Sequence, residues 1–265
     1  MPDVGFLLLL FVAAVLYTSV GHAGASGYLA VMTFYGLSQD VMRPSALVLN
    51  IVAAIPTTVQ FARSGHFDKR LFIPLSIGSI PFAAVGGYLK LPLSAFKLFL
   101  ALALIAAAVR LIWPGKSSST GTAFVARTCP FWLGLLIGGL LGLLAGLTSI
   151  GGGVYLTPIL LFAGWADPKK AAGVSSAFIL VNSISGLCGQ FVTSPDLMSH
   201  VPRDLMLWCI VVAVGGLIGS TSGSRRFGST TLRRILAFVL LLAVIKLIAA
   251  NPIVTTDASS TREMK

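Results

Sequence analysis

The chain has 265 residues, of which 56% are hydrophobic and only 10% are charged, and its mean hydropathy is +0.92. Soluble domains carry about 25% charged residues, so this composition excludes water as the main solvent and predicts an all-helical, polytopic membrane bundle. The net charge is +11, but the basic residues lie between apolar runs, a pattern that favours topology signals and lipid head-group contacts over nucleic-acid binding.

Eight hydrophobic stretches follow one another, at 4–34, 45–61, 71–89, 96–113, 131–163, 171–191, 205–220 and 235–250. Six have the length of one helical crossing, because about 20 residues at 1.5 Å each span a hydrocarbon core of about 30 Å. The first and fifth stretches are too long for one crossing, and glycine and small polar residues interrupt them at 21–27 and 148–153. These two segments are predicted to tilt strongly, break or turn back.

Alignment of the two interruptions exposes an internal repeat, in which four stretches recur as two halves. The equivalent positions are Tyr28 and Tyr155, Asn50 and Asn182, and the glycine pairs 86–87 and 215–216. The predicted organisation is therefore a first transmembrane repeat (1–113), a polar linker (114–130), a second transmembrane repeat (131–250) and a polar C-terminal tail (251–265).

The distribution of basic residues decides between straight crossings and turn-backs. Eight straight crossings would divide the 19 Lys and Arg residues ten to nine, without any bias. If the first and fifth stretches enter and leave on the same face, twelve of the 19 collect on one side, which fits the positive-inside tendency. We therefore expect two inverted repeats, each opening with a glycine-broken, re-entrant helix, and both termini outside.

The two breaks are also where we expect a binding site. Glycine-rich backbone at membrane depth is tolerated only against protein or a polar cavity, and a helix that restarts there offers free N–H groups to an anion. All eight acidic residues lie in loops, span ends or tails, so a relay built on buried carboxylates is not expected. The candidate substrate-binding residues are His22, Gly24, Ala25, Ser26, Gly27, Tyr28, Asn50, Gln60, Thr148, Ser149, Gly151, Gly152, Gly153, Ser175, Ser176, Asn182 and Gln190.

Structural explanations for these residues remain open. A Ser or Thr can bond its own helix, glycine allows close helix packing, and His22 could be a pH-sensitive ligand or a satisfied polar residue. His22 and Ser26 could also form an intramembrane hydrolase site, although no GxSxG pattern surrounds Ser26. No P-loop, haem-attachment or zinc spacing occurs, and the three cysteines lack a CxxC pair, so neither a cofactor nor a metal is expected.

The run from Gly146 to Gly153, followed by Pro158 and by Ala172-Gly173-Val174-Ser175-Ser176, resembles the glycine-rich signature of the TauE/SafE sulfite exporter family. The resemblance extends over nearly the whole chain. The first half departs from the pattern, with Gly24-Ala25-Ser26-Gly27 where a tighter glycine run is usual.

The resemblance implies a membrane transporter, not an enzyme. We expect the protein to move a small oxyanion, sulfite or an organosulfonate, across the inner membrane by alternating access between the two halves. The alternative is a channel-like pore for small anions or neutral solutes. The expected partners are the anion and the lipid bilayer; the sequence leaves open whether two copies of the chain form a homodimer.

Overall fold

The computed structural model describes residues 3–89, 127–196 and 201–226, and every regular element in these ranges is a helix. The expected stretches at 96–113 and 235–250, most of the linker 114–130 and the tail 251–265 lie outside the described residues. The described helices are α1 Val4–Ser19, α2 Ala25–Phe34, α3 Gln39–Arg63, α4 Lys69–Tyr88, α6 Phe131–Thr148, α7 Gly153–Phe162, α8 Pro168–Thr193 and α10 Leu205–Thr221, which continues into the π-helical turn η1 Ser222–Arg226.

Five of the described helices are long and apolar enough to cross a membrane: α3, α4, α6, α8, and α10 together with η1. Large apolar side chains cover the outside of the bundle, and Val4, Phe34, Val192 and Met206 are each more than 70% exposed. Such a continuous apolar surface is stable in lipid and not in water. The predicted all-helical membrane bundle is confirmed.

Acidic side chains mark where several helices begin. Asp3 accepts a hydrogen bond from the backbone N–H of Gly5, and Asp68 and Asp167 do the same at the starts of α4 and α8. A carboxylate in this position satisfies N–H groups that have no partner within the helix. These aspartates therefore stabilise the ends of the helices, in keeping with their predicted places outside the apolar stretches.

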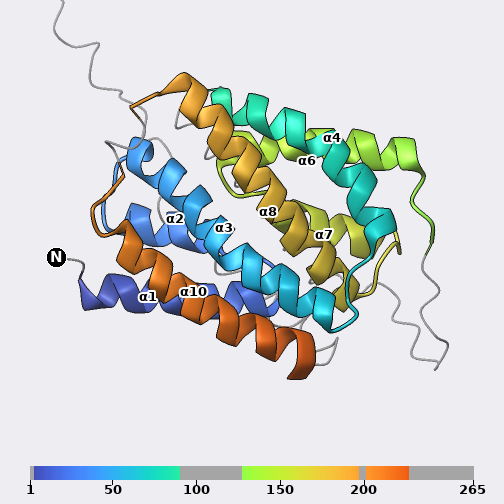
Figure 1. Ribbon diagram of the computed structural model, residues 1–265, viewed down its shortest axis with the longest axis horizontal. Coiled ribbons are helices and arrows are strands. Elements are labelled where there is room, and N and C mark those ends of the chain that lie inside the picture. The colour runs from blue at the N-terminus through green and yellow to red at the C-terminus, as the bar shows by residue number, and fades with distance from the viewer. Residues whose placement is uncertain (1–2, 90–126, 197–200, 227–265) are drawn as a thin grey trace, which may run out of the picture.

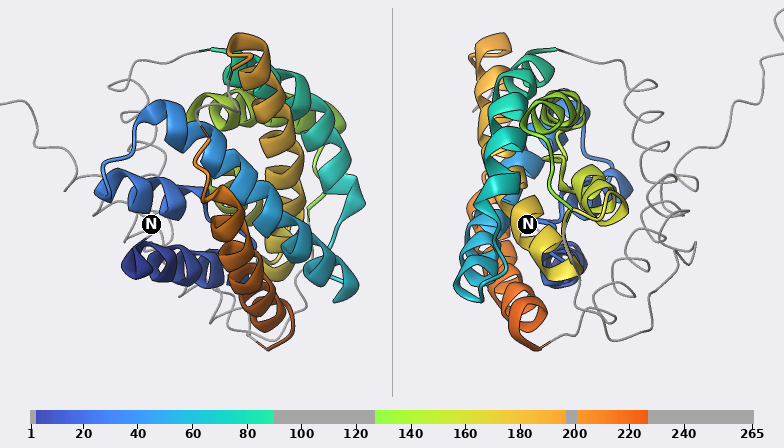
Figure 2. Two further views of the ribbon diagram at one scale, coloured as in Figure 1. Left: turned by 60° about the vertical axis from the view of Figure 1, so that its left-hand side comes forward. Right: turned by 90° about the vertical axis from the view of Figure 1, so that its right-hand side faces the viewer.

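The helices pack in pairs that correspond between the two halves. α3 and α8 pack against each other, α4 packs on α6 and α8, and α10 packs on α1 and α3 (Figure 1). In the right-hand view of Figure 2, α3, α4, α8 and α10 form one layer, with α6 and α7 on one side of it. When the first half is exchanged for the second, the α4–α6 pair becomes α1–α10 and the α4–α8 pair becomes α3–α10, whereas α3–α8 remains the same pair.

The glycine pairs of the repeat make equivalent contacts. Gly86 faces the backbone of Leu143 in α6, and its counterpart Gly215 faces the backbone of Phe11 in α1. In the same way the second glycine of each pair faces α8 in the first half and α3 in the second. These contacts support the predicted repeat, while its inverted orientation in a membrane stays a prediction.

Both glycine-broken segments turn back on themselves. The first breaks at residues 20–24 and returns to its start, where the hydroxyl of Tyr35 donates to the carboxylate of Asp3 over 3.1 Å. The second breaks at 149–152 and returns similarly, so that the N–H of Arg127 donates to the carbonyl of Gly164 over 2.9 Å. Each long stretch is thus a helical hairpin; its re-entry into a bilayer stays a prediction.

Most of the described basic residues gather at one end of the bundle, called here the basic end. The end of α3, the start of α8 and the end of α10 meet there, because Gln60 donates to Thr221 and Gly173 contacts the carbonyl of His66. Eight of the twelve basic residues predicted to share a side lie at this end: Arg63, Lys69, Arg70, Arg127, Lys169, Lys170, Arg225 and Arg226.

Candidate functional site

The first break leaves a buried helix start beside a buried histidine. Gly24 has φ +107° and precedes α2, whose first turn has no side-chain cap. The ring of His22 is fully buried, and its Nε2 lies 2.9 Å from the hydroxyl of Thr157, which lies 2.7 Å from that of Ser175. The first break is therefore joined through hydrogen bonds to α7 and α8 of the second half.

Other predicted residues hold the first break in shape. The hydroxyl of Tyr28 donates to the carbonyl of Ala23 over 2.6 Å, which ties α2 back to the break. A Cβ on Gly24 would lie 2.6 Å from the Tyr28 ring, so both the backbone angle and the space require glycine. Ser26 and Ala25 are buried in the first turn of α2, with Gly27 following them.

The second break has the more strained backbone. Gly151 and Gly152 have positive φ, and so does Ser149 at +57°, the one non-glycine residue among those described to do so. α7 then starts at Gly153 without a side-chain cap. A left-handed serine is disfavoured by about 1–2 kcal/mol, so its surroundings must hold it there.

Two residues of α3 hold this second break. Asn50, fully buried, donates through Nδ2 to the carbonyl of Ile150 over 3.1 Å and to the hydroxyl of Ser183 over 3.4 Å. Two helical turns earlier in α3, Arg43 donates through Nε to the hydroxyl of Ser149 over 3.3 Å. Residues seven apart share a helix face, so both side chains point from α3 into the same break.

Three residues that contact the breaks were not predicted from the sequence: Thr157, Ser183 and Arg43, of which Arg43 is the one with a charge. It lies outside the hydrophobic stretch 45–61, yet α3 begins at Gln39, and Arg43 is only 8% exposed. A signal was present, because Ser38 precedes the helix and Asp40 lies in its first turn, a pattern typical of a helix start. Extension of the helix to that point would have placed Arg43 on the face of Asn50.

The polar residues of α8 that contact the two breaks lie at different positions along the helix. Ser175 belongs to the chain from His22, whereas Ser183 contacts Asn50 and Gln190 donates to Ser149 over 3.0 Å. From Ser175 to Ser183 are eight residues, or about 12 Å along the helix. The structure therefore brings Ser149, Asn50 and Gln190 together and places His22 and Ser175 nearer the basic end.

The remaining predicted polar residues have partners away from the Ser149 contacts, either in their own helix or near the basic end. Asn182 donates to the carbonyl of Phe178 in its own helix, and Thr148 donates to that of Leu144 in the same way. Gln60 and Ser176 bond Thr221 and Thr58 near the basic end. Within the described ranges no three His, Cys, Asp or Glu side chains come together as a metal site would require.

The comparisons with known proteins agree with this architecture. The family described as "Sulfite exporter TauE/SafE" matches residues 6–247. The chain is 34% identical over 245 residues to "Probable membrane transporter protein y4hK" of Sinorhizobium fredii, a match that covers 92% of this chain and 98% of the relative. It is 30% identical over 256 residues to "Probable membrane transporter protein YjnA" of Bacillus subtilis, with 91% and 98% covered.

No solved structure matches the chain. The family match spans nearly the whole sequence, including both glycine breaks and the helices that hold them. The relatives are named as membrane transporters, in keeping with the multi-pass helical bundle. The chain therefore belongs to the TauE/SafE sulfite exporter family and is a multi-pass membrane transporter.

Proposed function

We propose that the protein is a secondary transporter that moves a small sulfur-containing oxyanion, sulfite or an organosulfonate, across the inner membrane by alternating access. The sulfur chemistry follows from the family, and the anion preference follows from the site. The transported anion is met by backbone N–H groups at the two breaks and by hydroxyl and amide side chains beside them.

The observation that carries this proposal is the pair of uncapped helix starts at the breaks. α2 and α7 each begin at a buried glycine break, and in neither does a side chain accept from the first turn. Such N–H groups and the positive end of the helix dipole favour an anion. The neutral side chains nearby add hydrogen bonds that an oxyanion can accept.

The position of the breaks also suits alternating access. The first break contacts α8 near the basic end, and the second contacts α3 and α8 further toward the opposite end. Each break is bonded to helices of the other half, so a rocking motion between the halves changes the surroundings of both breaks at once.

The test is counterflow in proteoliposomes. Vesicles loaded with unlabelled sulfite and diluted into ³⁵S-sulfite should show a transient accumulation of label that saturates with concentration and falls when methanesulfonate competes. Protein-free liposomes are the control. Absence of sulfite and sulfonate flux above that control would refute the proposal.

The second candidate is a channel-like pore for small anions or neutral solutes. Its flux would rise in proportion to concentration and would show no counterflow, because a pore does not need to reorient between binding events. The same vesicles therefore separate the two functions. The packing of both breaks against the opposite half favours the carrier, because transport then depends on movement between halves.

A further inference from the structure

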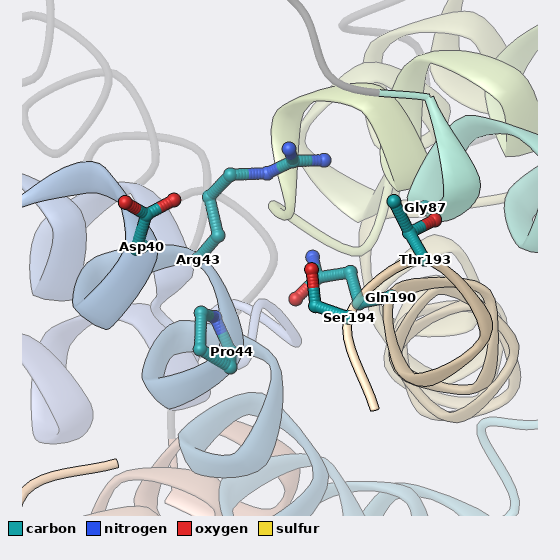
Figure 3. Close-up of a pocket in the computed structure, with 7 residues that line it drawn as sticks. All are labelled: Asp40, Arg43, Pro44, Gly87, Gln190, Thr193 and Ser194. Carbon is teal, nitrogen blue, oxygen red and sulfur yellow. The ribbon is translucent and has the colours of Figure 1, made fainter. Parts of the chain in front are cut away.

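A pocket opens at the end of the bundle opposite the basic end. It encloses about 300 Å³ of empty space, part of it open to solvent, and lies where the start of α3 meets the ends of α4 and α8. Because part of this space is open to solvent, a small anion can reach the lining residues from outside the bundle. The lining residues are Asp40, Arg43, Pro44, Gly87, Gln190, Thr193 and Ser194 (Figure 3).

Arg43 brings a buried positive charge to this pocket. Figure 3 shows its side chain extending from α3, with Gln190 across the pocket on α8. Nε donates to Ser149 and one terminal nitrogen to the carbonyl of Leu89, both over 3.3 Å. A guanidinium has five N–H donors, so several remain for another acceptor.

Within the described residues Arg43 forms no ion pair. Its hydrogen-bond partners are a hydroxyl and a carbonyl, both neutral. The carboxylate of Asp40, one turn away, interacts with Arg43 electrostatically, but Asp40 is exposed, so solvent screens its charge. The buried guanidinium is therefore only partly compensated, and its energy falls when an anion binds beside it. The positive charge of Arg43 therefore favours binding of an anion in the pocket.

Two neutral groups lie close to Arg43, one on Ser149 and one on Gln190. The hydroxyl oxygen of Ser149 accepts from both Arg43 and Gln190, so its own proton is left to donate. The amide oxygen of Gln190 is buried and has no partner among the described residues. The amide of Gln190 is therefore only half satisfied, and a water molecule in the pocket would complete it by donating a hydrogen bond to this oxygen.

We propose that Arg43 is the charge-selecting contact of the transported anion. Its planar fork binds two oxygens of a sulfite or sulfonate group, the hydroxyl of Ser149 donates to the same group, and the pocket is the entrance from which the anion reaches the second break. Arginine suits this role because its paired N–H groups match the spacing of oxygens on a planar or pyramidal oxyanion. This inference rests on the proposed function and adds the residue that selects for negative charge.

A purely structural role for Arg43 makes a different prediction. As a tie between Leu89 and Ser149, it would stabilise the fold without affecting ligand affinity. Its loss would then lower the melting temperature while the shift in that temperature caused by an anion stayed unchanged. The two roles are separated when stability and binding are measured on the same variant.

The experiment uses the purified full chain in detergent, with sodium sulfite and sodium methanesulfonate as probes and sodium chloride at equal ionic strength as the control. A ligand that binds the native state raises the melting temperature, and at a fixed ligand concentration the stabilisation grows with the logarithm of the affinity. Arg43→Gln should weaken binding of both probes by about 10- to 100-fold, as expected for loss of hydrogen bonds to a charged group. Arg63→Gln, an exposed arginine at the other end of α3, should bind like the wild type.

Two further variants keep the proposal testable if Arg43→Gln does not fold. Arg43→Lys retains the charge but loses the fork, and should bind with intermediate affinity. Asp40→Asn removes a negative charge from the exposed rim of the pocket and should strengthen binding by up to about fivefold.

Each outcome has a separate meaning. If the wild-type protein binds neither probe, both this inference and the proposed function are wrong. If the wild type binds and folded Arg43→Gln binds equally well, only this inference is wrong, and so it is if Asp40→Asn weakens binding. Wild-type affinity with Arg43→Lys would overturn the two-oxygen contact.

Discussion

The two repeat-equivalent asparagines should respond differently to the same substitution. Asn50→Leu removes the hydrogen bonds from α3 to the carbonyl of Ile150 and the hydroxyl of Ser183. Asn182→Leu removes only a bond to the carbonyl of Phe178, which within α8 also accepts the N–H of residue 182 itself. Only Asn50→Leu therefore leaves a buried carbonyl of the break, that of Ile150, without its hydrogen bond from α3.

The magnitude follows from that difference. A buried carbonyl left unsatisfied costs about 1–3 kcal/mol, whereas loss of the second bond to an already paired carbonyl costs about 1 kcal/mol or less. On the scale of globular proteins of this size, a difference of about 2 kcal/mol corresponds to roughly 4–8 °C in melting temperature. Leu is close to Asn in size and both sites are fully buried, so the packing effects largely cancel in the comparison.

The assay is thermal unfolding of the two purified variants in one detergent at one heating rate, followed by sulfite binding. We expect Asn50→Leu to melt lower than Asn182→Leu and to lose more affinity, because it loosens the break that Ser149 and Ile150 form. Equal melting temperatures, or a larger loss for Asn182→Leu, would show that the cross-half bond does not hold the second break.

Further predictions concern packing, backbone strain and pH. Gly87→Ala should destabilise the bundle by about 1–3 kcal/mol, because the new methyl group would overlap the carbonyl of Gly186. Gly186→Ala should be tolerated, because its methyl group would make only ordinary contacts, and thermal unfolding of the two variants measures the difference. Ser149→Gly should be more stable than Ser149→Ala by about 1 kcal/mol, since only glycine relieves φ +57°, and equal melting would refute the strain. Burial and the nearby Lys169 lower the pKa of His66 in the loop after α3, so the unfolded chain binds its proton first. Stability should therefore fall as pH drops below about 6.5, and His66→Gln should reduce that slope in melting curves from pH 8 to 5.

Much of the architecture follows from local sequence signals. The expected stretches 45–61, 71–89, 171–191 and 205–220 each correspond to one helix, with bounds that differ by a few residues in most cases. Hydrophobic length predicts a membrane helix well, because every backbone group in lipid must be paired within its own helix. The largest error is the start of α3, which lies six residues before the predicted one. Residues 39–44 include Gln39, Asp40 and Arg43, so the local hydropathy is low although the helix continues through them.

The breaks could also be predicted, although their spatial relation could not. The glycine-rich interruptions predicted at 21–27 and 148–153 overlap the observed breaks at 20–24 and 149–152, since non-helical backbone in a membrane needs residues that accept positive φ. Residues 25–27 belong to the first turn of α2 instead. The sequence does not specify that the first break meets α8 near Ser175 and the second near Ser183 and Gln190. That offset depends on how α3 and α8 cross.

Composition, hydrophobic length and the glycine breaks by themselves determined a helical membrane protein with two related halves. Only the tertiary structure decided what surrounds each break: it turned Arg43 inward from a span end toward Ser149, and it separated Asn50, which crosses between halves, from Asn182, which bonds its own helix. The physical reason is that helix formation depends on neighbours within one turn, whereas the contacts of Arg43 and Asn50 join residues at least 100 positions apart and exist only once both halves have packed together.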